Sequence, residues 1–166
     1  MPDSIGIIKT TIKDKGVFDV KELYKVMKRW LDVQGYGDET KGFKEEFYVE
    51  RIKGDVKQLE VKWRAEKTMS DYFSNVITIK ILIAAMKNVE IEIEGKKIPT
   101  FKSNLRIDIK SVLVKDRQGK FKSDFFRNIY DNTIVRDRVD RYWGYSYGKT
   151  NSFIDEIKTY LELRGT

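Results

Sequence analysis

Apolar and polar residues alternate along most of the chain between Phe43 and Val114. Because successive side chains of a β-strand point to opposite faces, this period of two predicts strands rather than helices. The clearest alternation would place Leu59, Val61, Trp63 and Ala65 on one face and Glu60, Lys62, Arg64 and Glu66 on the other. One buried face and one face in water are typical of an antiparallel sheet.

Other strands are predicted on both sides of this one. In the stretch 75–86 both faces are largely apolar, so we expect a central strand that is covered on both sides. Alternating stretches at 43–52, 89–95 and 104–114 add further strands. The β-branched stretch 4–13 predicts an opening strand, which we expect Asp14, Lys15 and Gly16 to end. The sheet would have about five to six strands.

A helix is predicted directly after the opening strand. Asp19 can cap its N-terminus, with Glu22 three residues later, and Gly35 is a natural stop. A single apolar stripe runs through Val20, Leu23, Met27, Trp30 and Leu31.

The C-terminal region contains "RYWGYSYGKT", which ends in Gly-Lys-Thr. A phosphate-binding loop needs four residues between its glycines and a buried strand before them, whereas three residues separate Gly144 from Gly148 and charged residues precede them. The spacing of Val135, Val139, Tyr142, Phe153, Ile157 and Tyr160 instead predicts a long helix. Its two glycines suggest the close approach of another backbone or a kink.

The predicted fold class is therefore α+β, an antiparallel sheet with an N-terminal helix and a long C-terminal helix packed on it. A chain of 166 residues without a linker-like stretch fits a single domain over 1–166. The longest apolar run, at 81–86, is much shorter than a membrane helix, and the first residues do not resemble a signal peptide. We expect a cytoplasmic protein without membrane insertion.

The chain has no cysteine and no histidine. This composition excludes disulfides, thiolate nucleophiles, imidazole bases and ordinary zinc or haem sites. No catalytic motif is present, so we predict neither a catalytic residue nor a cofactor, and we expect a protein that is not an enzyme. Magnesium bound through oxygen ligands stays open. The many charged residues also resemble the composition of thermophile proteins.

The net charge of +7 is concentrated in the stretch 96–122. There we single out Lys96, Lys97, Lys115, Arg117, Lys120 and Lys122 as candidates for binding a polyanion. The alternative is a solvated face in which Glu94 pairs with Lys102 and Glu90 with Arg106 across a hairpin.

Large aromatic residues lie on elements that should face one another. Trp30, Trp63, Phe126, Tyr142 and Trp143 are therefore candidates for lining a ligand cleft. The alternative is that these rings fill a core, and a third interpretation is that the C-terminal rings stack on nucleic acid bases.

The stretches "ELYKVMKRWLDVQGY", "EVKWRAEKTMSDYF" and "RNIYDNTIVRDRVDRYW" resemble an uncharacterised family of small archaeal proteins. The element order also resembles the helix-grip (START-like) class. That resemblance implies a curved sheet wrapped around a long C-terminal helix, with an internal cavity. We expect a binding protein, a monomer or homodimer, that holds an apolar or amphipathic small molecule or a protein partner between sheet and helix. The alternative is an RNA- or ribosome-associated protein that uses the basic stretch 96–122.

Overall fold

The computed structural model describes residues 3–36, 43–70, 72–115 and 136–164. The elements are β1 (Asp3–Phe18), α1 (Val20–Val33), β2 (Phe43–Lys53), β3 (Val56–Thr68), β4 (Phe73–Ile93), β5 (Lys96–Lys115) and α3 (Arg136–Arg164). The five strands form one antiparallel sheet in the order β1-β5-β4-β3-β2. The α+β class, with an N-terminal helix and a long C-terminal helix, is confirmed.

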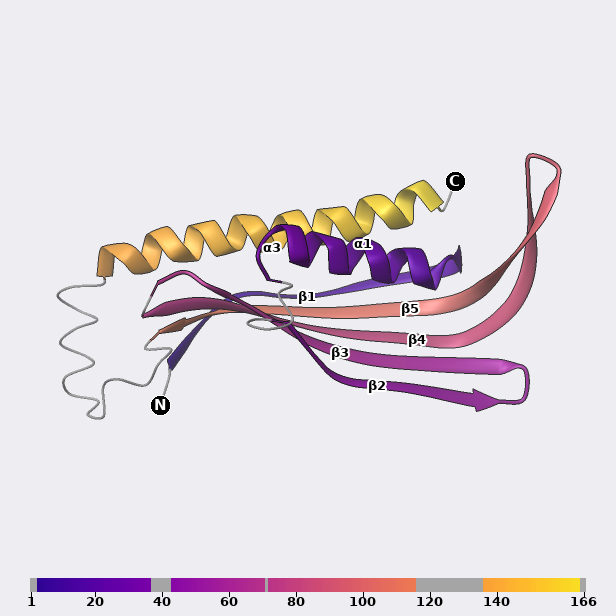
Figure 1. The fold of residues 1–166 in the computed structure, drawn as a ribbon, viewed down its shortest axis with the longest axis horizontal. Helices are drawn as coiled ribbons and strands as arrows, with labels where there is room; N and C mark the ends of the chain where they lie inside the picture. Colours follow the sequence, from indigo (N-terminus) through magenta and orange to yellow (C-terminus); the bar gives the residue numbers. More distant parts are fainter. Residues whose placement is uncertain (1–2, 37–42, 71, 116–135, 165–166) are drawn as a thin grey trace.

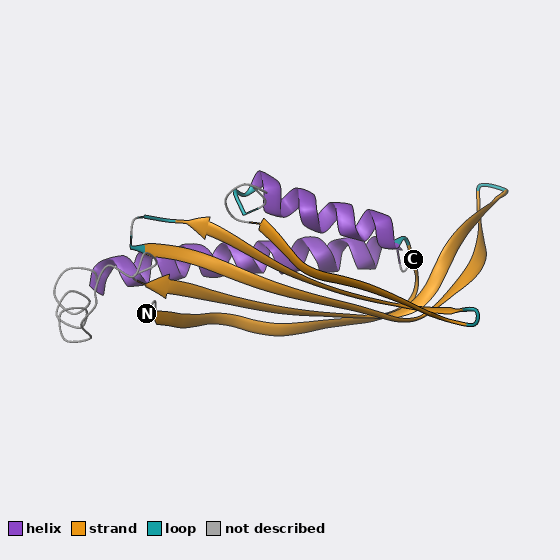
Figure 2. Cartoon of the chain, turned by 60° about the horizontal axis from the view of Figure 1, so that its bottom comes forward, coloured by secondary structure: helices purple, strands orange, loops and turns teal. Residues whose placement is uncertain are grey.

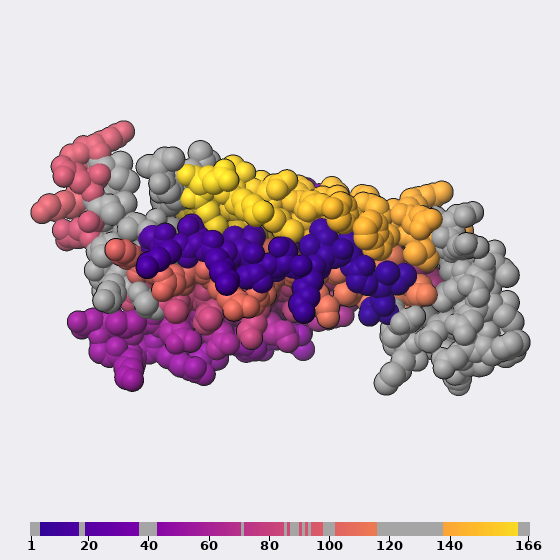
Figure 3. Space-filling view, turned by 180° about the vertical axis from the view of Figure 1, so that it is seen from behind, coloured from indigo at the N-terminus to yellow at the C-terminus, as the bar shows by residue number. Residues whose placement is uncertain are grey.

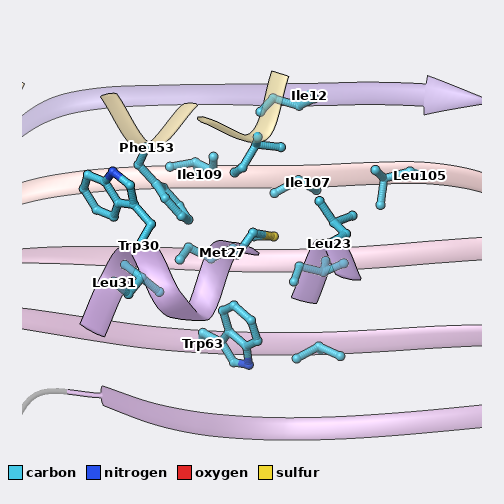
Figure 4. Close-up of a cluster of buried hydrophobic side chains, with 14 of the residues drawn as sticks. Ile12, Leu23, Met27, Trp30, Leu31, Trp63, Leu105, Ile107, Ile109 and Phe153 are labelled. Carbon is cyan, nitrogen blue, oxygen red and sulfur yellow. The ribbon is translucent and has the colours of Figure 1, made fainter. Parts of the chain in front are cut away.

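Both helices lie on the same face of the sheet, which we call the helix face (Figures 1 and 2). The core lies between the two layers and contains the alternating apolar residues of β3, β4 and β5 (Figure 4). Ile77, Ile79, Ile81 and Ile83 point into it from β4 and are buried. From α1, the predicted residues Leu23, Met27, Trp30 and Leu31 are buried in the same core, which confirms the stripe.

The ends of α1 follow from local chemistry. The Asp19 carboxylate accepts hydrogen bonds from the backbone N–H groups of Lys21 and Glu22, at 2.9 and 3.3 Å. At the other end Gly35 has a φ of +88°, and the N–H of Tyr36 donates to the Leu31 carbonyl at 2.7 Å. This is the hydrogen bond of a Schellman motif. Such motifs often bring together apolar residues at these two positions, and here Leu31 and Tyr36 are both buried.

Three expectations about the sheet are wrong. β1 does not end at Asp14, Lys15 and Gly16, because it continues to Phe18 in register with β5. The two strands expected at 75–86 and 89–95 are one strand, β4. The central strand is not covered on both sides, since Lys80 is exposed while Thr78 and Leu82 are half-buried on the face away from the helices.

The hairpin register assumed for the charged residues is also wrong. The turn between β4 and β5 contains only Glu94 and Gly95, which both have positive φ, as in the tight primed turns of two-residue hairpins. Glu92 therefore lies opposite Lys97, and Glu90 lies opposite Pro99 rather than Arg106. Since the hairpin is tighter than assumed, the proposed pairs of opposite charge do not form.

The Gly-Lys-Thr sequence lies in the middle of α3, as the helical spacing predicted. Thr150 is buried and its hydroxyl donates to the Ser146 carbonyl one turn earlier, at 2.8 Å. Gly144 and Gly148 are exposed, and a Cβ added at either would meet no atom within 4 Å. The expected close approach of another backbone at these glycines is therefore wrong.

Candidate functional site

Two of the five aromatic cleft candidates are packed in the main core. Trp30 packs against Phe153 in a tilted arrangement, with ring centroids 4.9 Å apart. Trp63 is fully buried, and its Nε1 donates to Glu45 Oε1 at 3.1 Å. Tyr24 meets the Trp63 ring edge-on, with centroids 4.7 Å apart. These two tryptophans stabilise the contact between sheet and helices, which is the core-filling alternative.

Tyr142 and Trp143 belong to a second, smaller cluster near the start of α3. Tyr142 packs on the buried Phe73 ring, with centroids 5.1 Å apart. Trp143 donates from Nε1 to the Gly6 carbonyl at 3.1 Å and stacks on Tyr147. The structure thus divides these candidates between two clusters, and Phe126 lies outside the described residues. The hypothesis of a ligand between sheet and α3 stays a prediction.

The basic candidates are not brought together either. Lys96 and Lys97 are exposed at the tip of the β4–β5 hairpin, which projects beyond the rest of the molecule (Figure 3). Lys115 is the last residue of β5, and the strand has 20 residues. At about 3.3 Å per residue its two ends lie about 60 Å apart along the strand. Arg117, Lys120 and Lys122 lie outside the described residues.

The positive charge gathers instead on the sheet face opposite the helices, which we call the open face. It contains the even-numbered residues of the central part of β3, β4 and β5 and their partners on β1 and β2. Its basic residues are Lys9, Lys13, Lys15, Lys44, Lys62, Arg64, Lys80, Arg106 and Lys110. Its acidic residues in the same region are Glu46, Glu60, Glu66 and Asp108.

One row of this face crosses all five strands without an acidic residue. Following the register from β2 to β1, the row contains Lys44, Arg64, Thr78, Lys110 and Lys9. Neighbouring strands lie about 4.8 Å apart, so the row presents four cations across a distance of about 19 Å. A linear array of this kind attracts an extended chain of negative charges.

Several cations of the open face lie directly opposite one another. Lys9 faces Lys110, Lys13 faces Arg106, and Lys62 faces Lys80. Like charges in such cross-strand positions destabilise a sheet, by about 0.2–1 kcal/mol per pair. Ion pairs of Lys62 with Glu46 and of Arg106 with Asp108 offset part of this repulsion. Among the described residues, Lys9 and Lys110 are therefore the least compensated of the three pairs.

The described residues of the open face form three ion pairs. Lys62 pairs with Glu46 and Arg64 with Glu66, each at 3.0 Å, and Arg106 Nε donates to Asp108 Oδ1 at 3.2 Å. Asp108 Oδ1 also accepts a hydrogen bond from the Thr11 hydroxyl at 2.6 Å. That hydrogen bond, aided by the charges of Arg106 and Lys80, lowers the pKa of the Asp108 carboxyl. Asp108 is thus a stabilised carboxylate that pairs with Arg106.

Reasoning from single strands missed this face. The alternation of β3 correctly places its charged residues on a wet face, but it does not connect them with Lys80, Lys9 or Lys110 on the neighbouring strands. The available signal was the recurrence of basic residues at alternate positions of neighbouring strands. Because strands are adjacent only in the folded sheet, the register decides which of these charges meet.

Other kinds of site find no support in the described parts of the chain. Within residues 3–36, 43–70, 72–115 and 136–164 there is no group of three or more acidic side chains that could hold a metal ion. Neither α1 nor α3 has a stretch long and apolar enough to cross a membrane.

No known family model matches the chain, and no curated protein matches it.

Proposed function

We propose that the protein binds nucleic acid through the open face of its sheet. The observation that carries this proposal is the acid-free row of Lys44, Arg64, Lys110 and Lys9, together with the like-charge pairs around it. Phosphate groups along a nucleic acid backbone would neutralise these cations, and the released counterions would favour binding. This moves the RNA-binding hypothesis from the stretch 96–122 to the sheet.

A nucleic acid fits this face better than an anionic membrane does. Peripheral membrane binding combines basic residues with apolar side chains that insert between lipids. The large apolar residues that are most exposed among the described ones are Val33, Tyr48, Ile52, Tyr145 and Tyr147. They lie on α1, on α3 or on the helix-face side of β2, so they point away from the cations of the open face.

The test is the binding of a fluorescent RNA, measured by anisotropy over a range of salt concentrations. We expect affinity to fall steeply with salt and the variant with Lys13→Glu, Lys44→Glu and Lys110→Glu to bind at least tenfold more weakly. Loss of three phosphate contacts should reduce the slope of log affinity against log salt by about 2–3. Each new glutamate lies opposite Arg106, Arg64 or Lys9, so the fold should persist.

The matched control makes the same change of net charge on the other side of the molecule, with Lys21→Glu, Lys25→Glu and Lys158→Glu on exposed positions of α1 and α3. It should leave RNA binding almost unchanged. An equal loss in both variants would show that only net charge matters and would overturn the proposal. Binding to vesicles that contain phosphatidylserine, without binding to RNA, would overturn it as well.

A further inference from the structure

The open face contains a hollow of about 650 Å³ where β1, β5 and β4 lie side by side. Lys13, Lys15, Leu82, Ala84, Asn104 and Arg106 line it from the open face, and Asp14 and Leu105, which belong to the helix face of their strands, complete the lining. The hollow is a depression that is widely open to solvent rather than an enclosed cavity. Lys13 and Arg106 at the rim lie two register steps from the acid-free row, and the row that contains Lys80 and Asp108 lies between them.

The hollow lies beside an irregularity of the sheet. Ala84 pairs with Asn104 and Lys87 pairs with Lys102, so two residues of β4 lie opposite the single residue Ser103. This is a β-bulge, which bends the bulged strand and increases its twist. Beyond it β4 and β5 turn toward the helix side of the sheet (Figures 1 and 2).

The side chains around the hollow offer three kinds of contact. Leu82 and Ala84 are half-buried and present an apolar surface. The exposed amide of Asn104 supplies both donors and an acceptor. Arg106 Nε donates to Asp108 Oδ1, and Arg106 and Lys13 place two positive charges at the rim.

An apolar surface, an amide and two cations together match one nucleotide better than a bare phosphate. A base could lie on Leu82 and Ala84, with Asn104 bonding its edge and Arg106 stacking on its face, as arginine planes do with unpaired bases. The lysines would hold the neighbouring phosphates. A base inside a duplex is stacked and paired on all of these surfaces, so only an unpaired base can make the contacts.

Building on the proposed function, we infer that this hollow receives one unpaired nucleobase, so that the protein prefers single-stranded to double-stranded nucleic acid. The cations hold the backbone of either form, because phosphates are common to both. The hollow adds contacts to the single strand only. Those contacts belong to the bases, so they persist at salt concentrations that weaken the phosphate contacts.

The experiment compares a fluorescent RNA single strand with a duplex of the same sequence at one salt concentration. We expect the single strand to bind about tenfold more tightly, given that one base stacked on a protein surface contributes a factor of this order. Filling the hollow with Ala84→Met should lower single-strand affinity to the duplex value and leave duplex affinity unchanged. Asn104→Ala, an exposed position that does not threaten folding, should reduce the preference about threefold.

The control is Val49→Met, which places the same side chain on the open face of β2, outside both the hollow and the row of cations. It should leave the preference intact. Equal affinity of wild type for single strand and duplex, or a preference that Ala84→Met and Val49→Met change equally, would overturn the inference and leave the proposed function standing. If neither RNA binds, the proposed function fails and the inference fails with it.

Discussion

Reversing one charge of a like-charge pair should stabilise this protein while it weakens RNA binding. Lys110 on β5 lies opposite Lys9 on β1, and both side chains are exposed. Two unit charges about 6 Å apart in water repel each other by about 0.7 kcal/mol. Lys110→Glu turns this repulsion into an attraction of similar size, and screening at 0.1 M salt roughly halves the difference. We expect a gain of about 0.8 kcal/mol in the free energy of unfolding.

The assay is urea-induced unfolding at 0.1 M and at 1 M salt, with RNA binding measured on the same preparations. At 1 M salt the gain should fall to about 0.2 kcal/mol, because the screening length shrinks to about 3 Å. Lys15→Glu is the matched control, since Lys15 lies on the same face opposite the neutral Asn104. Adding Lys9→Glu to Lys110→Glu restores a pair of like charges and should remove the gain. Destabilisation by Lys110→Glu, or a gain that salt does not reduce, would refute the reasoning.

Three further predictions concern stability. Asn75 bonds the Tyr36 hydroxyl, Ser111 and the Val112 carbonyl in the interior, so Asn75→Ala should cost about 3 kcal/mol in chemical denaturation, and a cost below about 1 kcal/mol would contradict this. The lowered pKa of Asp108 stabilises the fold above the pKa of an unfolded aspartate, about 3.9, and this contribution is lost as the pH falls through the folded value. The difference in unfolding free energy between wild type and Asp108→Asn should therefore shrink from pH 6 to pH 3, whereas a constant difference would count against it. Replacing Gly144 and Gly148 by alanine should add about 1 kcal/mol each to the free energy of unfolding and raise the melting temperature, because the new Cβ atoms meet open space. A lower melting temperature would contradict the idea that these two glycines only weaken the helix.

Features that depend on nearby residues were predictable from the sequence. The Asp19 cap and the Gly35 stop lie within a few residues of α1, and they set its ends as expected. The alternation around Trp63 identified a strand with one wet face, because burial on one side imposes a period of two. The long α3 was predicted from spacing alone, despite its central glycines.

Features that depend on register were not predictable in the same way. The turn at Glu94 and Gly95 is shorter than assumed, which moves every later pair of the hairpin. Asp14 did not interrupt β1, because pairing with β5 continues through it. Which lysines meet on the open face follows from four strand pairings at once, and no single segment contains that information.

Because both helices lie on one face of the sheet, the residues that form the core and the residues available for binding alternate along the same strands. Residues such as Trp63 and Ile79 form the core, while their immediate neighbours Lys62 and Lys80 lie on the open face. Substitutions at alternate positions of the same strands can thus reshape what the surface recognises with little effect on the interior. The open face of this sheet can therefore diverge in sequence while the core between the sheet and the helices stays the same.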